Sequence, residues 1–270
     1  MMGSIMDYPK ITVITPSYNQ ADFLERTICS VLGQNYPNLE YIVIDGGSSD
    51  GSLDVIKKYA EQLSYWVSEP DSGQAHAINK GLKMATGEWV CWQNSDDIFY
   101  PECFKQLMLA ARRYPHADLI IGNMQLIDEH DQPIRELKYV KPTYRSLLAE
   151  GMVLTNQAAF WRRKVHSKAG FLDEKLDCGF DYEWFLRLHS KNSKAAHINS
   201  LWGGLRIHAD TKTNQRQHIF HQEYQQILAG RRVPGVVKKL YQFRRLCLTL
   251  RNGEIGYVVR GSFRRLFRFV

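Results

Sequence analysis

The first hundred residues alternate between short apolar segments and amphipathic segments, and this alternation restricts the fold more than any other feature. Four apolar segments are predicted strands: 10–15, 39–44, 64–67 and 88–93. Three segments with helical spacing of apolar residues separate them: 22–34, 51–63 and 74–85. Because strands joined by helices pair in parallel through right-handed crossovers, the pattern predicts an α/β fold with a doubly wound, mostly parallel sheet.

Polar residues follow each predicted strand: Pro16-Ser17-Tyr18-Asn19, Asp45-Gly46-Gly47, Glu69-Pro70-Asp71 and Asn94-Ser95-Asp96-Asp97. Parallel strands end at one edge of the sheet, which is where ligands of α/β folds bind, so these residues are expected to line one crevice. The paired carboxylates of Asp96 and Asp97 suit Mg²⁺ or Mn²⁺ carrying a phosphate. The alternative is that these acids cap a helix, because Pro101 soon follows.

The second half of the chain has a mixed pattern. A helix is predicted at 101–113, a strand at 118–122, a hairpin across 124–139, further strands at 158–163 and 195–201, and a helix at 180–191. Parallel winding is therefore expected to stop near residue 101. The length of 270 residues, 44% of them hydrophobic, suits one large domain with or without an appendage.

The net charge of +7 is concentrated at the end of the chain. Residues 231–270 contain eleven Lys and Arg and a single acid, Glu254, whereas residues 1–230 have slightly more acids than bases. Basic clusters alternating with apolar residues are typical of helices on an anionic membrane, so 231–270 is predicted to be a basic amphipathic helical extension that binds one. The alternative is a helical pair packed on the domain. No nucleic-acid motif is present, and no nucleic-acid partner is expected.

The cysteines and the first residues indicate a compartment. Five scattered cysteines without a C-x-x-C pair predict neither a disulfide framework nor a zinc ribbon, which is typical of a reducing environment. Residues 1–10 lack the apolar segment of a signal peptide, and no apolar run approaches the roughly 18 to 20 residues of a membrane span. The expected location is cytoplasmic, peripheral on the inner face of the plasma membrane.

Four motifs, in this order and spacing, resemble family 2 glycosyltransferases of the GT-A fold. They are Ile11–Asn19, Tyr41–Gly51, Asn79–Gly81 with Ala85–Gly87, and Asn94–Asp97. The resemblance covers residues 10 to about 210. It implies a GT-A domain over 1–230, with a nucleotide-sugar half at about 10–100 and an acceptor half at about 101–213. It also implies a nucleotide-diphospho-sugar donor and inversion at the anomeric carbon.

Carried over residue by residue, the resemblance implies three groups of binding residues. The nucleotide contacts are Pro16, Tyr18, Asn19, Asp45, Gly46, Asp71 and Asp96. The donor-sugar contacts are His76, Asn79, Lys80 and Asn94. The ligands of Mn²⁺ or Mg²⁺ are Asp96, Asp97 and His208, the last in a segment, Leu205–His208, that resembles the R-x-H element of the family. Asn94 stands where the family's D-x-D motif has its first acid, so either aspartate remains a candidate ligand.

The predicted chemistry needs one base. A cation can neutralise the charge of a departing diphosphate, so what remains is to deprotonate an acceptor hydroxyl with one positioned carboxylate or histidine. Asp181 resembles the acid that supplies this base, although Phe180 precedes it where the family usually has another acid. Glu183 is the alternative base, and Asp181 could instead cap the helix that follows it.

The expected function is metal-dependent, inverting transfer of a sugar from a UDP-sugar to a hydroxyl of a glycan or lipid-linked acceptor in cell-surface polysaccharide or lipopolysaccharide synthesis. One alternative is a sugar nucleotidyltransferase, but such an enzyme is expected to have a Gly-rich phosphate loop with a basic residue, which residues 16–19 lack. The other alternative is a non-catalytic module that binds sugar nucleotides or membranes.

Overall fold

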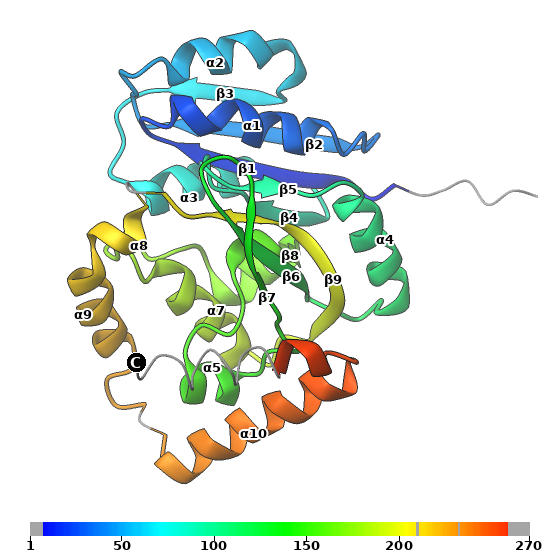
Figure 1. Cartoon of the computed structure of the whole chain (residues 1–270). Coiled ribbons are helices and arrows are strands. Elements are labelled where there is room, and N and C mark those ends of the chain that lie inside the picture. Colours follow the sequence, from blue (N-terminus) through cyan, green and yellow to red (C-terminus); the bar gives the residue numbers. More distant parts are fainter. Residues whose placement is uncertain (1–7, 209–210, 232, 259–270) are drawn as a thin grey trace, which may run out of the picture.

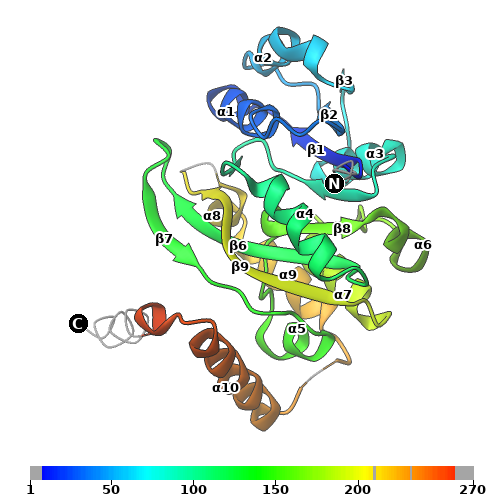
Figure 2. The same ribbon diagram turned by 90° about the vertical axis from the view of Figure 1, so that its right-hand side faces the viewer.

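The structure is a computed structural model that describes residues 8–208, 211–231 and 233–258 (Figure 1). One sheet runs through the molecule with strand order β3-β2-β1-β4-β8-β6-β9-β5, and β7 pairs with β6 outside this path. Helices cover both faces of the sheet (Figures 1 and 2). The chain is therefore doubly wound, as predicted.

The first half is a parallel sheet of four strands, β1 (Ile11–Ser17), β2 (Leu39–Asp45), β3 (Tyr65–Ser68) and β4 (Trp89–Trp92). They are connected by α1 (Ala21–Leu32), α2 (Ser52–Tyr59) and α3 (Gln74–Met84). Each predicted strand and helix of this half is confirmed, with ends that shift by a few residues. β1 lies in the middle and is buried along its whole length, which explains its continuous apolar sequence.

The second half is mixed, as predicted. β8 (Ala159–Arg162) pairs antiparallel with both β4 and β6 (Leu119–Ile127), and β9 (Ala195–Arg206) runs parallel to β6. β7 (Pro133–Leu137) forms the expected hairpin with β6. The sequence did not predict β5 (Ile98–Phe99), because two residues are too few to show an alternating pattern.

Two motif glycines are required by close packing. A Cβ on Gly81 of α3 would lie 2.5 Å from Cγ2 of Ile14, and a Cβ on Gly87 would lie 2.5 Å from Oγ1 of Thr12. Any side chain at either position would push α3 and the start of β4 away from β1. The glycines of the Asn79–Gly81 and Ala85–Gly87 motifs thus set how closely α3 approaches the strand that leads into the crevice.

The remaining helices are α4 (Cys103–Arg113), α5 (Tyr144–Glu150), α6 (His166–Ala169), α7 (Phe180–Ser190), α8 (Lys212–Gln215), α9 (Gln217–Ile227) and α10 (Gly235–Arg251). Short 3₁₀ turns occupy Ala60–Gln62, Asn156–Ala158 and Arg163–Val165. The two halves share a core of buried aromatic rings, in which Trp92, Trp161 and Trp184 lie within 6.2 Å of one another by ring centroid. These rings pack around Trp92, the last residue of β4, just before the polar turn at 94–97.

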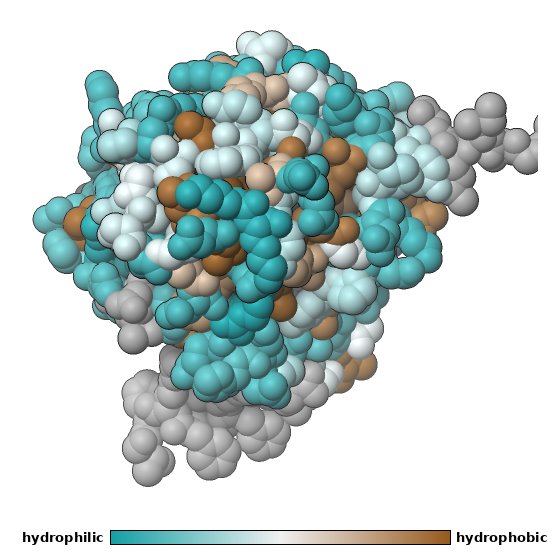
Figure 3. Space-filling model, turned by 90° about the horizontal axis from the view of Figure 1, so that it is seen from above, coloured by the Kyte–Doolittle hydropathy of each residue, from teal (hydrophilic) through white to brown (hydrophobic). Residues whose placement is uncertain are grey.

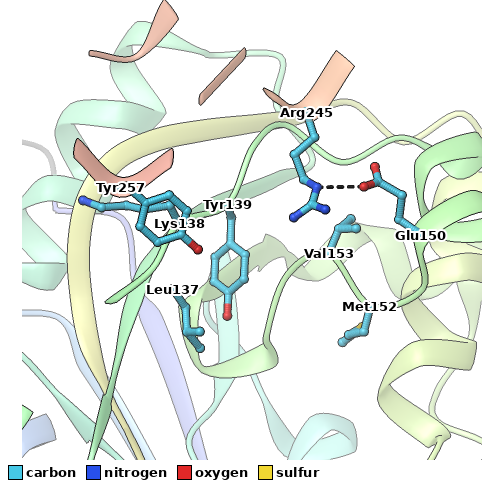
Figure 4. Close-up of a pocket in the computed structure, with 8 residues that line it drawn as sticks. All are labelled: Leu137, Lys138, Tyr139, Glu150, Met152, Val153, Arg245 and Tyr257. Carbon is cyan, nitrogen blue, oxygen red and sulfur yellow. Dashed lines mark hydrogen bonds and ion pairs between the residues drawn. The ribbon is translucent and has the colours of Figure 1, made fainter. Parts of the chain in front are cut away.

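α10 lies within the predicted extension and packs against α5. Its Arg245 pairs with Glu150 at 2.7 Å, and the residues just after it are held by Asn199, which donates to the carbonyl of Asn252 at 3.2 Å. A cavity of about 190 Å³ lies between α10 and the sheet, where Tyr139 and the Arg245–Glu150 pair project into it (Figure 4). Residues 259–270 of the predicted extension lie outside the described residues.

None of the helices in the described part of the chain combines the length and the apolar composition that a bilayer span requires.

Candidate active site

Residues 94–97 form a turn after the carboxyl end of β4, and a side chain of α1 fixes this turn by hydrogen bonds. The Thr27 hydroxyl lies 2.8 Å from the carbonyl oxygens of both Ser95 and Asp97. Just before them, the Gln93 N–H donates to the carbonyl of Ile14 at 2.8 Å. The turn is therefore held between β1 and α1 at the sheet edge where ligands of α/β folds bind. No motif in the sequence pointed to Thr27.

Asp97 is buried, and its carboxylate is engaged by two other segments and by Asn94 of its own turn. It accepts hydrogen bonds from the backbone N–H of Arg206 at 2.8 Å, the side chain of Gln157 at 2.6 Å and the side chain of Asn94 at 3.3 Å. Burial raises the pKa of this carboxyl well above its usual value, and the neighbouring charge of Asp96 adds to the effect. Asp97 therefore links the turn at 94–97 to β9 and to the turn Asn156–Ala158. Because both of its carboxylate oxygens already accept hydrogen bonds, this geometry does not favour its predicted role as a metal ligand.

Asp96 points the other way and remains partly open, with 20% of its side chain exposed. Its Oδ2 lies 3.2 Å from Nε2 of His208, a residue 112 positions later in the chain. The His208 ring packs on Phe23 of α1, with ring centroids 4.6 Å apart. The structure thus brings together two of the three predicted metal ligands.

The Asp96–His208 pair is suited to share a divalent cation with a ligand. The described residues contain no group of three or more His, Cys, Asp and Glu side chains that would hold a metal ion on their own. A carboxylate oxygen and an imidazole nitrogen are nevertheless ligands that Mn²⁺ accepts, and the oxygens of a diphosphate could complete its coordination. The residues present therefore fit a cation that arrives with a phosphate-bearing ligand.

Arg206 is a buried cation beneath this pair. Its Nε donates to the carbonyl of Asp96 at 2.6 Å, and its Nη1 donates to the carbonyl of Asp128 at 3.0 Å and pairs with Asp131 at 2.5 Å. Arg26 of α1 pairs with the same Asp131 at 3.1 Å. These contacts draw the tip of the β6–β7 hairpin up against α1 (Figure 1). The R-x-H resemblance pointed to Arg206 but not to its hairpin partners.

Asp45 is fully buried at the end of β2 and shapes the turn that follows. Its carboxylate accepts from the N–H groups of Gly47 and Ser48 at 3.1 and 2.9 Å, and from the hydroxyls of Ser48 and Ser68 at 2.5 and 2.7 Å. Asn19 links this turn to β1, because its side chain accepts from the Ser49 N–H at 2.9 Å. Contact between Asp45 and a nucleoside remains a prediction, since these partners already engage both carboxylate oxygens.

The other predicted nucleotide residues gather around this turn. The Asp71 carboxylate lies directly over Gly46, where an added Cβ would be 2.9 Å from its Oδ2. Tyr18 extends outward from the end of β1 with 63% of its surface exposed, whereas Pro16 is buried within the strand. The arrangement leaves an exposed aromatic ring and a carboxylate beside a glycine turn, which suits a base and ribose.

The predicted donor-sugar residues differ in their surroundings. Asn79 is buried and bonds to both backbone groups of Leu172 at 3.0 and 2.9 Å and to Glu174 at 2.7 Å, so the geometry does not favour a sugar contact. Lys80 is paired with Glu69. Of the remaining two, Asn94 accepts from Gln74 at 3.0 Å, and the half-buried His76 accepts from the Ser72 N–H at 3.3 Å.

Asp181 lies in the first turn of α7, where the Tyr182 N–H donates to its Oδ1 at 2.6 Å. Burial raises the pKa of this carboxyl to about 6, and the nearby Lys212 opposes the rise. Such a carboxylate is ionised at neutral pH yet more basic than an exposed aspartate, which suits a general base. The alternative, Glu183, is paired with Arg187 at 2.8 Å, and Arg187 also holds the carbonyl of Phe171 at 2.7 Å.

The turn that carries Asp96 and the turn before Asp181 are both contacted by residues from one stretch of chain, between 206 and 212. Arg206 and His208 reach the turn after β4, and a few residues later Lys212 pairs with Asp177 at 2.8 Å, just before α7. Asp96 and Asp181 are therefore connected through this segment. The sequence pattern could not reveal the link, because Lys212 and Asp177 belong to no motif.

Comparisons with known proteins agree with this arrangement. The sequence pattern described as Glycosyl transferase family 2 matches residues 12–170. An uncharacterized glycosyltransferase of Rickettsia typhi is 30% identical over 193 residues, which cover 66% of this chain and 58% of that protein. TuaG of Bacillus subtilis, whose name proposes a role in teichuronic acid biosynthesis, is 42% identical over 92 residues, covering 33% of this chain and 36% of TuaG.

Solved structures share the fold. S. aureus TarS 1–349 in complex with UDP-GlcNAc superposes with a TM-score of 0.67 at 17% identity, covering 86% of this chain and 70% of that one. The mannosyltransferase PcManGT from Pyrobaculum calidifontis, in complex with GDP-Man and Mn²⁺, gives a TM-score of 0.62 at 21% identity, covering 88% and 69%. These neighbours confirm the predicted GT-A type fold.

The aligned region is shorter than several of the relatives. It spans 31% and 30% of two further Rickettsia glycosyltransferases, from R. felis and R. conorii, as well as the 58% of the R. typhi protein. The match to the family pattern nevertheless includes more than half of this chain and contains the turns after β1, β2 and β4. The chain belongs to glycosyltransferase family 2.

Proposed function

We propose that this protein transfers a sugar from a UDP-sugar to a hydroxyl of a glycan or lipid-linked acceptor, with inversion at the anomeric carbon. The observation that carries the proposal is the Asp96–His208 pair, 3.2 Å apart, at the sheet edge where the turns after β1, β2 and β4 meet. The exposed Tyr18 and the Asp71 carboxylate over Gly46 would receive the nucleoside. The UDP-GlcNAc bound to TarS supports a UDP-sugar donor, and the role in teichuronic acid biosynthesis that the name of TuaG proposes supports a polysaccharide acceptor.

Asp96 and His208 would hold the Mn²⁺ or Mg²⁺. A bound divalent cation would neutralise the negative charge that develops on the diphosphate leaving group. Arg206 adds a buried positive charge behind Asp96 and fixes the turn that carries it. The chain therefore needs no general acid to release the nucleotide.

Asp181 would take the proton from the acceptor hydroxyl. Its raised pKa of about 6 allows it to be ionised at neutral pH and still attract a proton as the hydroxyl attacks. Direct attack by an acceptor, with one base and no intermediate on the enzyme, gives inversion. Glu183 is the weaker candidate because Arg187 engages its oxygens.

Nucleotide binding and transfer can be tested separately. UDP with Mn²⁺ should raise the melting temperature by about 5 to 10 °C at saturating ligand, and Asp96→Asn should abolish the Mn²⁺-dependent part of the rise. UDP release from UDP-glucose, UDP-galactose and UDP-GlcNAc would then identify a donor. Stabilisation by GDP but not UDP would contradict the donor assignment. UDP binding without UDP release from any donor would favour a non-catalytic module.

We further propose that α10 holds the protein on the inner face of the plasma membrane. Its outward side is an apolar stripe of Val236, Leu240, Phe243 and Leu250, all exposed. Helical spacing places Lys239 and Arg251 along the two borders of this stripe, and α10 contains no acid. Apolar residues bordered by cations fit an anionic lipid surface. The opposite end of the molecule, over α1 and α2, is largely hydrophilic with scattered apolar spots (Figure 3).

A single substitution can test the membrane contact without removing α10. Phe243→Glu should reduce sedimentation with vesicles of phosphatidylcholine and 30 mol% phosphatidylglycerol by about tenfold, because it places a negative charge in the inserted stripe. Leu109→Glu is the control, since Leu109 is an equally exposed apolar residue on α4. Equal binding by the parent and Phe243→Glu would remove the membrane proposal.

A further inference from the structure

The start of α7 is capped by a side chain from another helix. The N-cap residue of α7 is Gly179, which has no side chain to cap the helix. Instead the Glu223 carboxylate of α9 accepts hydrogen bonds from the N–H groups of Asp177, Cys178 and Gly179 at 2.7, 2.9 and 2.6 Å. These three residues form the turn that leads into α7, and a carboxylate that accepts from three N–H groups fixes this turn firmly.

Gly179 allows α9 to come this close. A Cβ at position 179 would lie 3.0 Å from Cδ1 of Ile227 and 3.3 Å from Oε2 of Glu223. Ile227 is buried against the core, so it has little room to retreat. The chain thus has a residue without a side chain where Glu223 must reach the backbone.

Two cations hold the same turn from another side. Lys212 pairs with the Asp177 carboxylate at 2.8 Å and also donates to the Asp177 carbonyl, and Arg216 pairs with the same carboxylate. Contacts of both signs from the α8–α9 region therefore converge on residues 177–179. Asp181 follows two residues later, so its direction depends on how this turn is held.

We propose that Glu223 is a positioning residue that orients the Asp181 carboxylate and keeps it basic. This inference rests on the proposed role of Asp181 as the base. The physical reason has two parts. Glu223 holds the three N–H groups of residues 177–179 and thereby fixes the backbone that leads to Asp181. A weaker cap would also free these N–H groups to turn toward the Asp181 carboxylate, which would make it less basic.

The other charged groups around Asp181 are largely compensated. Asp177 is neutralised by Lys212 and Arg216, and Glu183 by Arg187 on the same helix. Lys212 favours the ionised form of Asp181. The titratable groups of Cys178 and Tyr182 lie on either side in the chain. Glu223, by contrast, is bound by backbone N–H groups, which carry partial rather than full positive charge.

Glu223→Gln keeps the shape of the cap and removes its charge. In the full chain labelled with ¹³C at aspartate carboxyls, the Asp181 titration midpoint should fall by about half a pH unit, the size of effect a helix start has on a carboxylate. The Asp181 signal is identified by its loss in Asp181→Asn. Amides 177–179 should exchange with deuterium about tenfold faster, because a neutral amide accepts more weakly than a carboxylate. Transfer should lose about tenfold in kcat with an unchanged KM for the UDP-sugar.

Glu150→Gln is the matched control, because Glu150 is likewise an acid engaged by another helix but lies under α10. It should leave the Asp181 titration and the exchange of amides 177–179 unchanged. Gly179→Ala is a second variant, which should displace Glu223 and lower the Asp181 midpoint in the same direction. An unchanged midpoint in Glu223→Gln, or an equal change in Glu150→Gln, would overturn the proposal. A shifted midpoint in a parent that releases no UDP would contradict the proposed function alone, because the titration needs no activity.

Discussion

Asp96 and Asp97 are neighbours in sequence but have opposite surroundings. Asp97 turns inward, where Arg206 of β9 and Gln157 supply donors, and Asp96 turns outward toward His208. The difference arises because the Thr27 hydroxyl binds the backbone carbonyls of Ser95 and Asp97. These bonds fix the turn with one carboxylate on each side of it. One acid is therefore suited to hold the fold and the other to hold a ligand.

Substituting each acid separately should distinguish these roles. Asp97→Asn should lower the free energy of unfolding by about 2 kcal/mol, because an amide NH₂ would replace an oxygen that faces donors. Asp96→Asn should change it by less than about 0.5 kcal/mol. Urea unfolding at pH 7.5 measures both. A larger loss for Asp96→Asn than for Asp97→Asn would show that the roles are reversed.

Asp181 should give the transfer reaction an acid limb. With a pKa of about 6, protonation removes the base, so kcat/KM should fall tenfold per pH unit below about pH 6. A series of rates from pH 4.5 to 8.5 with a limiting acceptor and a saturating UDP-sugar measures this limb. Asp181→Asn should leave a slow rate that does not fall in this way as the pH decreases. A limb that persists in Asp181→Asn would assign the base to another group.

The same pKa predicts a gain in stability for Asp181→Asn. A carboxyl whose pKa is raised from 3.8 to about 6 on folding stabilises the fold below pH 3.8, and this advantage is lost as the pH rises through 6. At pH 8 the variant should therefore be more stable by about 1 to 2 kcal/mol, less than the full value because the residue still reaches solvent. Urea unfolding at pH 8 and pH 4 measures the difference, which should nearly vanish at pH 4. A variant that is less stable at pH 8 would show that folding does not raise this pKa.

At the scale of elements, α3 illustrates how a motif can serve packing. Gly81 permits the close approach of α3 to β1, and Asn79 on the same helix bonds to the backbone of Leu172. The family motif at 79–81 therefore joins the crevice wall to the segment that precedes α7. Neither contact requires a sugar.

Asn79→Ala tests whether this residue contacts the donor. Two hydrogen bonds to the buried backbone of Leu172 and one to Glu174 would be lost, so the free energy of unfolding should fall by about 2 to 3 kcal/mol while the KM for the UDP-sugar stays within about twofold. Urea unfolding and steady-state kinetics measure the two effects. A raised KM with unchanged stability would support the donor-sugar role predicted from the resemblance.

At the scale of the whole molecule, α10 is built into the domain. Arg245 binds Glu150 of α5, and Asn199 and Lys138 hold the residues that follow α10. Asn199 in turn bonds to Asn123 inside the sheet at 2.8 Å. This network holds the outward stripe of α10 in a fixed direction.

Removing residues 234–270 should therefore destabilise the domain. The truncation removes the Arg245–Glu150 pair and the contacts of Asn199 and Lys138 with Glu254, so the free energy of unfolding should fall by about 2 to 3 kcal/mol. Phe243→Glu, on the outward side, should change it by less than about 0.5 kcal/mol. Urea unfolding of both measures the difference. If the truncated chain were as stable as the parent, α10 would be an independent appendage.

The sequence alone determined the sheet, its parallel half and the edge where polar residues gather. Strand and helix periodicity is local, and right-handed connection of parallel strands then forces residues such as Asp45 and Asp96 to the same edge. Family motifs added the expectation that His208 would reach this edge. These conclusions needed only short-range patterns and one rule of connectivity.

The tertiary structure decided the surroundings of each acid. Which of Asp96 and Asp97 is buried and which stays partly exposed depends on Arg206 and His208, more than a hundred residues later. The ion pair between Glu183 and Arg187 depends likewise on side-chain directions, and the cap formed by Glu223 depends on packing between helices. Periodicity describes which face of an element is apolar, but it does not say which distant partner meets a given carboxylate. That choice is made only when the helices and strands pack together.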